Sequence, residues 1–179
     1  MIISVGGPAG SGKSTLASLL SSSLSLPLIS AGEIFRTRAK ELGLSVVEFN
    51  RVASEDSQFD IKLDEEVVRL TREKGSCVIE GRLACFMLRR TGIQTFCVYL
   101  DAEEQVRAER VAKRDGKSLS DALSEIRERG KRERERYIAF YGIDISDTAG
   151  YDLRLDSTTA RPELLRDEVL SAMRMRGLI

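Results

Sequence analysis

The chain has 179 residues, of which 42% are hydrophobic and 31% are charged, a balance that fits one globular domain with a core of ordinary size. Lys plus Arg and Asp plus Glu both total 28, so no net charge is available to attract nucleic acid or an acidic membrane. Histidine is absent, which excludes acyl transfer through a Ser-His pair and zinc chemistry with histidine ligands. Phosphoryl transfer stays open, because Lys, Arg and Mg²⁺ supply the positioning and charge stabilisation on which it depends.

The three cysteines, Cys77, Cys85 and Cys97, are scattered in apolar runs. This pattern is typical of reduced core thiols rather than of a disulfide framework or a metal site, and it predicts a reducing compartment. The sequence shows no basic leader with a cleavable apolar stretch and no apolar run of membrane-spanning length. We therefore expect a cytoplasmic protein without a membrane partner.

Short β-rich runs alternate with segments of helical periodicity along the chain. The alternation predicts an α/β fold, a parallel sheet covered by helices on both faces. No internal repeat or linker interrupts the pattern, so residues 1–179 are expected to form a single domain. The predicted strands are Ile2–Val5, Leu26–Ser30, Cys77–Glu80, Thr95–Leu100 and Tyr151–Leu155.

A glycine-rich loop that matches G-x-x-x-x-G-K-[ST] follows the first strand and precedes a predicted helix, Ser14–Ser25. In such a loop backbone N–H groups and the helix N-terminus bind phosphates, Lys13 reaches the β and γ phosphates, and the Ser14 hydroxyl ligates Mg²⁺. The alternative, a β-to-α turn that binds nothing, rarely carries both Lys and Ser after its last glycine. The residues assigned to ATP are Gly7, Pro8, Ala9, Gly10, Ser11, Gly12, Lys13, Ser14 and Thr15.

Two or three helices are expected between the second and third strands, over residues 31–76. That is more chain than a single crossover needs, and it predicts a substrate-binding flap at the sheet edge. The stretch contains an acidic stripe, Asp56, Asp60 and Asp64, for which base or ribose recognition competes with helix capping and solvation. The signals for helix ends are the capping-box pairs Ser30 with Glu33 and Ser45 with Glu48, and the glycines Gly43 and Gly75.

Two arginines follow predicted strands directly: Arg36 comes after the second and Arg82 after the third. Ligands of parallel sheets bind at the carboxyl ends of strands, so both side chains are expected at the edge that carries the phosphate loop. The two arginines therefore predict that a second anion binds beside the γ-phosphate. Glu80 ends the third strand where a Walker-B-type acid would hold a water on Mg²⁺, the alternative being an ordinary acid at a strand end.

After the fourth strand, two predicted helices each present three arginines on one face. Like charges at this spacing repel one another, so helix stability alone does not explain them. We expect the region of about residues 110–136 to close as a lid over the triphosphate. The alternative is a solvated helix pair in which these arginines pair with Glu125, Glu128, Glu133 and Glu135. The arginines are Arg107, Arg110 and Arg114, then Arg129, Arg132 and Arg136.

The phosphate loop and four further segments together resemble the short cytidylate kinases of archaea, over nearly the whole chain. The resemblance implies a five-stranded parallel sheet of the adenylate-kinase type within the P-loop NTPases, with an NMP-binding insertion at 31–76 and a short lid. It also implies Mg²⁺-ATP as phosphoryl donor and CMP or dCMP as acceptor. The four segments are Ser30–Arg36, Glu80–Ala84, Arg129–Tyr137 and Tyr141–Asp144.

The resemblance also implies residue roles. Arg110 and Arg114 match arginines that cover ATP, and Arg36 and Arg82 match those that hold the acceptor phosphate. The acceptor set is Ser30, Gly32, Arg36, Arg82, Arg129, Glu133 and Arg136, and the catalytic set is Lys13, Arg110, Arg129 and Arg136. One departure is Gly130, where an acid is expected. A glycine there loosens the helix by about 0.5–1 kcal/mol relative to alanine.

Other functions remain open at this stage. The nearest is a kinase for another monophosphate, such as UMP or AMP. A P-loop regulatory ATPase or binding protein belongs to a different class, but it gives no reason for both Arg36 and Arg82 to point at the γ-phosphate. RNA binding or RNA end-phosphorylation would require a broad basic surface. We expect a monomer that uses ATP and CMP or dCMP and has no nucleic-acid partner.

Overall fold

The computed structural model covers residues 1–179 and describes their side chains except those of residues 46, 47, 54 and 57. Across these residues the centre is a five-stranded sheet in the order β2-β3-β1-β4-β5, with every neighbouring pair parallel. The strands are β1 (Ile2–Gly6), β2 (Leu28–Ser30), β3 (Cys77–Glu80), β4 (Phe96–Asp101) and β5 (Leu153–Asp156). The predicted α/β class and parallel sheet are confirmed, and each strand lies within two residues of its predicted bounds.

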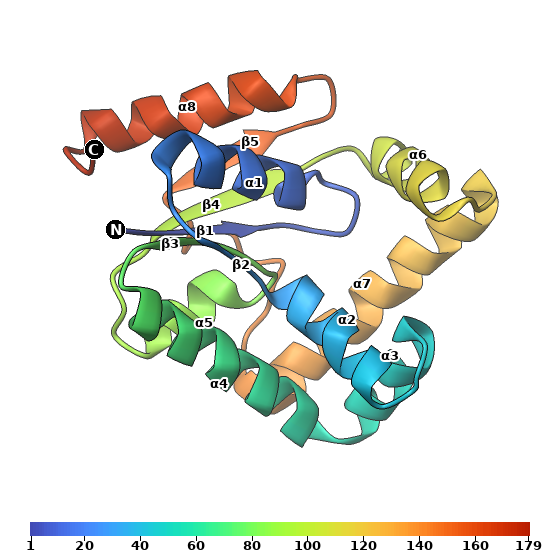
Figure 1. Ribbon diagram of the computed structural model, residues 1–179. Helices are drawn as coiled ribbons and strands as arrows, with labels where there is room; N and C mark the ends of the chain where they lie inside the picture. The colour runs from blue at the N-terminus through green and yellow to red at the C-terminus, as the bar shows by residue number, and fades with distance from the viewer.

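Helices cover both faces of the sheet. In Figure 1, α1 and α8 lie together above it, and α4 and α5 lie below. The upper layer packs Leu16 and Met173 against Ile3 and Val98, all of them at most 1% exposed. Burial on both faces explains why β1, β3 and β4 are mainly apolar instead of alternating between apolar and polar residues. The helices are α1 (Lys13–Leu24), α2 (Ala31–Glu41), α3 (Val46–Glu55), α4 (Ser57–Lys74), α5 (Ala84–Arg90), α6 (Glu104–Asp115), α7 (Leu119–Tyr141) and α8 (Pro162–Met175).

The insertion after β2 consists of α2, α3 and α4, whose ends follow the predicted signals. Ser30 accepts a hydrogen bond from the Glu33 N–H, and Ser45 forms a complete capping box with Glu48. Gly75 ends α4 with a φ of 66°. The three helices lead away from the sheet edge, as the sequence predicts for this segment (Figure 1).

Helices α6 and α7 form an arm beyond the carboxyl ends of the strands (Figure 1). Gly116 ends α6 in the left-handed conformation, and the Ser118 hydroxyl accepts from the Asp121 N–H to begin α7. The long α7 then runs back toward the insertion. The arm therefore faces the edge of the sheet where the phosphate loop and the strand-end arginines lie.

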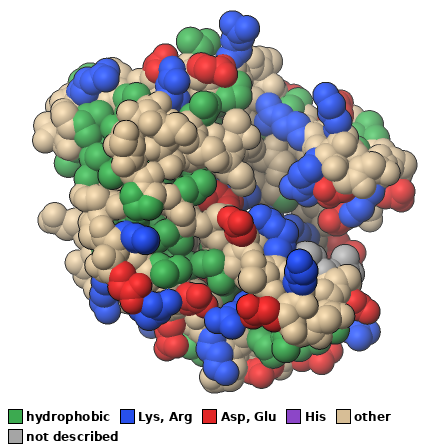
Figure 2. Space-filling model, in the orientation of Figure 1, with side chains coloured by type: hydrophobic (Ala, Val, Ile, Leu, Met, Phe, Trp, Pro, Cys, Tyr) green, Lys and Arg blue, Asp and Glu red, His purple; other side chains and the backbone are tan. Residues whose placement is uncertain are grey.

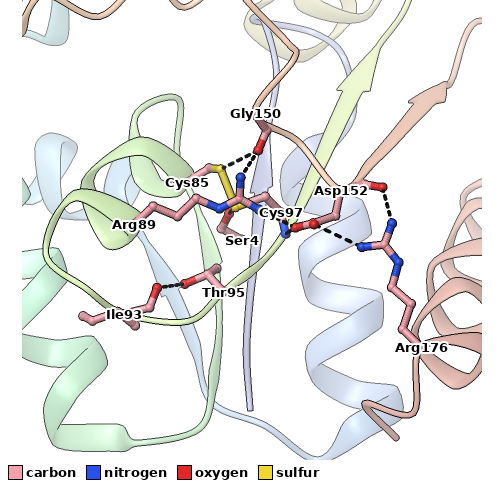
Figure 3. Close-up of polar contacts among 9 residues, drawn as sticks. All are labelled: Ser4, Cys85, Arg89, Ile93, Thr95, Cys97, Gly150, Asp152 and Arg176. Atoms are coloured by element: carbon pink, nitrogen blue, oxygen red, sulfur yellow. Dashed lines mark hydrogen bonds and ion pairs between the residues drawn. A yellow bond between two sulfur atoms is a disulfide. The ribbon is translucent and has the colours of Figure 1, made fainter.

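The cysteines depart from the prediction. Cys85 at the start of α5 and Cys97 on β4 form a disulfide, with Cα atoms 5.7 Å apart (Figure 3). The prediction of three reduced core thiols is therefore wrong. Because it was the basis for predicting a reducing compartment, the cysteines no longer support that prediction. Cys77 is a buried free thiol. The two bonded cysteines meet because α5 packs against β4 around Tyr151, a tertiary contact that their spacing in the sequence does not reveal. Among the described residues, no helix is long and apolar enough to cross a membrane.

Candidate active site

The loop between β1 and α1 depends on its glycines. Gly7 has a φ of 144° and Gly10 a φ of 79°, conformations that residues with a Cβ rarely adopt. A Cβ on Gly10 would lie 2.5 Å from the Arg107 carbonyl oxygen, and one on Gly7 would overlap the Leu100 carbonyl. The glycines therefore allow the loop to fold closely against β4 and α6. They also leave backbone N–H groups free of side-chain cover.

The N-terminus of α1 opens into this loop. Its N-cap is Gly12, and no side-chain cap satisfies the first N–H groups among the described residues. Lys13 folds back over the loop, with Nζ 3.3 Å from the Pro8 carbonyl oxygen and 3.7 Å from Glu80 Oε1. Burial, reinforced by the neighbouring Arg82, lowers the pKa of Lys13 to about 8. Free N–H groups, a helix dipole and a buried cation together form a strong anion site.

Arg110 fastens the loop to the far side of the sheet. Its guanidinium donates to the Gly10 carbonyl at 3.3 Å and to Oγ and the carbonyl oxygen of Ser157 at 2.9 and 2.6 Å. The buried Ser157 hydroxyl in turn donates to the Ser11 carbonyl at 2.7 Å. Sequence reasoning did not find Ser157, because a serine after a strand carries no signal of its own. Arg110 is thus part of the loop's support, in addition to its predicted role over ATP.

The remaining lid arginines take different positions. Arg107 donates to the carbonyl groups of Ala102 and Ala9, while Arg114 pairs with Asp115 at 2.6 Å on the surface. On α7 the exposed Arg132 pairs with Glu128, so the predicted three-arginine face divides, and salt bridges account for part of it. Arg114 nevertheless lies close enough to the site for its charge to contribute to the lowered pKa values of Lys13 and Arg129.

Arg82 and Arg129 converge beside Lys13. Both pair with one buried carboxylate, Glu133 on α7, Arg129 Nε being 2.7 Å from its Oε1. Burial and the neighbouring Arg129 lower the pKa of Arg82 to about 9, and burial lowers that of Arg129 as well. These cations come from α1, the turn after β3 and α7, and they disfavour one another's charge. An anion at this point would relieve that repulsion.

The predicted acceptor side also contains a cation that makes no ion pair among the described residues. Among the described residues Arg36 on α2 has no hydrogen-bond or ion-pair partner, and its guanidinium passes close to Gly32, where an added Cβ would lie 3.4 Å away. Ser30 donates to Glu80 Oε2 at 2.7 Å, fixing that carboxylate between β2 and Lys13. Figure 2 shows Lys and Arg side chains gathered around the recess between the body of the molecule and the α6–α7 arm.

A cavity of about 340 Å³ lies between the phosphate loop and α7. It is bounded by Gly7, Pro8 and Ala9 on one side and by Ile126 and Gly130 on the other. Gly130, the departure noted in the sequence, lines this space, and a Cβ added there would meet no atom within 4 Å. The glycine is therefore not required by packing.

The donor set fits a magnesium ion that is bound chiefly by phosphates and water. Ser14 offers a hydroxyl at the start of α1, and Glu80 offers a carboxylate held by Ser30 and Lys13. Mg²⁺ commonly uses one or two protein oxygens together with substrate phosphates. In the described part of the chain no group of three or more Asp, Glu, Cys or His residues is placed to hold a metal ion by itself.

A second polar cluster, unforeseen in this form, joins the insertion to α7. Asp60 Oδ2 on α4 lies 2.8 Å from Arg136 Nε, and the Tyr141 hydroxyl donates to Asp64 Oδ2 at 2.6 Å. Solvation was one interpretation of the acidic stripe, and it is wrong for these two acids, which are 3% and 8% exposed. Asp56 does cap α4, through the Gln58 N–H. The helical period predicts that the acids share one face of α4, but it does not predict which side chains they contact.

The chain has the architecture of the P-loop kinases: the strand order is 2-3-1-4-5, a phosphate loop follows β1, and arginines follow β2 and β3. Residues 2–159 match the model of the cytidylate kinase-like family, and the chain belongs to that family. It is 41% identical over 163 residues to the cytidylate kinase of Sulfurisphaera tokodaii, covering 91% of this chain and 89% of the relative. To the cytidylate kinase of Natronomonas pharaonis it is 43% identical over 173 residues, covering 97% and 89%.

Solved structures agree with the fold. An uncharacterized protein from Eubacterium ventriosum superposes with a TM-score of 0.74 at 20% identity, over 97% of this chain and 98% of the other. The shikimate kinase of Aquifex aeolicus superposes with a TM-score of 0.62 at 25% identity, over 99% of both chains. The predicted fold class and the predicted family are therefore confirmed.

Proposed function

We propose that the protein transfers the γ-phosphoryl group of ATP to CMP, and also to dCMP, forming the diphosphate. The observation that carries this proposal is the convergence of Lys13, Arg82 and Arg129 from three separate elements on one point beside the phosphate loop. One nucleotide bound to the loop accounts for Lys13 alone. The cytidylate kinase relatives support CMP as the acceptor.

The catalytic work is positioning and neutralisation of charge. The loop N–H groups and Lys13 hold the β and γ phosphates of ATP, and Arg36 and Arg82 hold the acceptor phosphate in line with the γ-phosphoryl. Arg129 adds positive charge where negative charge spreads over the transferring group. No general base is required, because a nucleoside monophosphate is already largely dianionic at neutral pH. Closing α7 over the recess excludes water and limits hydrolysis of ATP.

Mg²⁺, when bound, neutralises phosphate charge, and Ser14 and Glu80 are the residues that would hold it. The Ser14 hydroxyl would contribute directly, and Glu80 directly or through a water. Ser30 orients Glu80 by donating to its Oε2, which keeps the carboxylate at the loop. Arg110 keeps the loop itself in place through Gly10 and Ser157.

The proposal is tested by a coupled assay of ADP formation with ATP, Mg²⁺ and CMP, dCMP, UMP, AMP or GMP in parallel. CMP and dCMP are expected to give the highest kcat/KM values. A higher value for UMP or AMP would assign the protein to another monophosphate. ATP hydrolysis that no monophosphate stimulates would favour a regulatory ATPase instead. Omission of Mg²⁺, with excess chelator, is expected to abolish the reaction.

A further inference from the structure

The helix that follows Arg82 is linked covalently to the sheet. Helix α5 has seven residues, and within the described part of the chain its N-cap, Leu83, makes no side-chain capping hydrogen bond. Isolated helices shorter than about 12 residues are marginal in water, so the position of α5 depends on its tertiary contacts. Cys85, the second residue of α5, is joined by the disulfide to Cys97 on β4. The bond therefore fixes the end of α5 that adjoins Arg82.

The disulfide also lies behind a group of aromatic side chains. Tyr151 packs on the two bonded cysteines, and Phe86 and Tyr99 pack against the same buried cluster. The Tyr151 ring makes edge contacts with the rings of Phe86 and Tyr99, at centroid distances of 5.7 and 5.1 Å. Such contacts add to the burial of the rings. The bond and the three rings therefore form one packed unit between α5 and β4.

Two of these aromatic residues face the groups that the proposed reaction uses. Tyr99, Tyr151 and Arg82 line the cavity of about 340 Å³ together with Pro8 of the phosphate loop. Tyr151 also packs on the last residue of β1, because a Cβ added to Gly6 would lie 2.6 Å from the Tyr151 hydroxyl. A shift of α5 against β4 would therefore move Arg82 and the tyrosine wall relative to the phosphate loop.

Polar contacts hold the other end of α5 (Figure 3). Arg89 donates to the Gly150 carbonyl and pairs with Asp152 at 2.6 Å, and Arg176, which follows α8, pairs with the same carboxylate at 3.0 Å. These three charged side chains are partly exposed, and exposed ion pairs contribute little to stability. The disulfide is therefore the stronger tether of α5, and it holds the end nearer to Arg82.

We propose that the Cys85–Cys97 disulfide positions Arg82 for the acceptor phosphate, so that use of CMP depends on the redox state of this bond. A dithiol transfers two electrons and two protons, which breaks the S–S bond, leaves two thiols on the protein and forms a disulfide in the reductant. Two thiol sulfurs do not stay at bonding distance, so α5 and β4 separate at this point. The phosphate loop is held by Arg110 and Ser157 instead, and those contacts remain. This inference rests on the proposed function.

The test compares the oxidised and reduced forms of the wild-type protein and needs no variant. Both bonded cysteines are at most 1% exposed, so treatment with dithiothreitol continues until an unfolded sample titrates three thiols. Below the Tm of the reduced form, reduction should raise the KM for CMP at least about 5-fold, because a positioning group that moves by about 1 Å can cost far more than that. The Kd for ATP should stay at its oxidised value, and reoxidation should restore the KM for CMP.

Two results of this comparison would overturn the proposal. One is an unchanged KM for CMP in the fully reduced protein. The other is an equal weakening of CMP and ATP, which would indicate general loosening of the fold rather than positioning of Arg82. Failure of the oxidised enzyme to phosphorylate any monophosphate would instead refute the proposed function.

Two variants separate the disulfide from other effects of the reductant. The Cys85→Ser, Cys97→Ser double variant should have the KM for CMP of the reduced wild type and should not respond to dithiothreitol. Cys77→Ala removes the buried free thiol and should respond as the wild type does. A response of the double variant to dithiothreitol would assign the effect to another group and overturn the proposal.

Thermodynamic linkage supplies an independent measurement. If the bond raises the affinity for CMP by a given factor, saturating CMP must shift the thiol–disulfide equilibrium toward the bond by the same factor. The reduced fraction is measured in mixtures of reduced and oxidised dithiothreitol, with CMP and without it. CMP should lower that fraction, by the ratio of affinities found for the two forms. An equilibrium that CMP does not shift would contradict the coupling between the bond and the acceptor half.

Discussion

The proposed donor and acceptor halves of the site are built differently. On the donor side, consecutive residues from Gly7 to Ser14 form the binding surface, and Arg110 and Ser157 tie its backbone in place. On the proposed acceptor side the cations come from α2, the turn after β3 and α7, and most of them are held in ion pairs. The donor half is therefore preorganised by the backbone, whereas the acceptor half is held by charges that a substrate can replace.

This difference suggests how the halves respond to substrate. In the proposed reaction, a phosphate that reaches Arg82 competes with Glu133, which pairs with that arginine in the structure. The new contact with substrate then replaces an existing ion pair, so the net gain in binding free energy is small. Such a replacement favours specificity and closure of the site over tight binding of CMP. In the proposed reaction, ATP binds N–H groups that have no side-chain cap and therefore displaces few existing contacts. Substitutions on the two sides should therefore impair the reaction in different ways.

The largest effect is expected for Lys13→Ala. Turnover should fall on the order of 10²-fold or more, because one preorganised charge beside the transferring phosphoryl is lost. The free energy of unfolding should change little, since Lys13 is a buried cation close to Arg82. Coupled assays and thermal unfolding measure the two effects. Lys74→Ala, at the exposed end of α4, is the control, and near-normal turnover of Lys13→Ala would refute the assignment of the phosphate loop.

Arg82→Ala should affect the acceptor half selectively. The KM for CMP is expected to rise and kcat to fall, with a combined loss of about 10- to 100-fold in kcat/KM, as for removal of a buried charged partner. Glu133 keeps Arg129 as its partner, so the fold should tolerate the change. Calorimetry should find the Kd for ATP unchanged. If ATP binding weakened and CMP binding did not, the two phosphate sites would be exchanged.

The Cys85–Cys97 disulfide braces the start of α5, three residues beyond Arg82. It closes a loop with a sequence separation of 12, and its loss should cost about 2–3 kcal/mol in the free energy of unfolding. Reduction should lower the Tm of the wild-type protein and leave the Tm of the Cys85→Ser, Cys97→Ser double variant unchanged. Thiol titration of the unfolded, unreduced protein should find Cys77 alone. A count of three thiols would contradict the bond.

Arg110→Ala distinguishes support of the loop from a role confined to the lid. If the guanidinium supports the loop, its removal leaves the Ser157 carbonyl without its Arg110 donor and costs about 1–2 kcal/mol in the free energy of unfolding. ATP binding should weaken at the same time. Arg114→Ala removes only a surface pair with Asp115 and should change the Tm little. A loss of turnover in Arg110→Ala without a loss of stability would indicate a purely catalytic role.

The two halves also differ in how far the sequence predicts them. The phosphate loop lies within eight consecutive residues whose types have few other uses, and the strand-end rule places Arg36 and Arg82 from the order of elements alone. The fold follows from the same alternation of strands and helices. Tyr141 and Asp64 meet across 77 positions, and Ser157 reaches Ser11 across 146. Contacts of this kind arise from packing between elements, so neither helical periodicity nor motif spacing reveals them.

The disulfide was missed for a related reason. Counting cysteines favoured free thiols, because three are odd in number and lie in apolar runs, and both facts remain true of the structure. What pairs Cys85 with Cys97 is the return of α5 against β4, where Arg89 also contacts Gly150 and Asp152 (Figure 3). Local sequence gives the helix and the strand but not their contact.

The central claim is that the donor and acceptor halves enclose one continuous chain of phosphates, and a bisubstrate compound tests it most directly. Adenosine joined to cytidine through five phosphates should bind at least about 100-fold more tightly than ATP or CMP alone, because the second half binds without a second loss of translational freedom. Backbone amides of residues 31–76 and 110–136 should gain protection from hydrogen exchange in the complex. Calorimetry that found the compound no tighter than ATP, with exchange in both segments unchanged, would contradict the account.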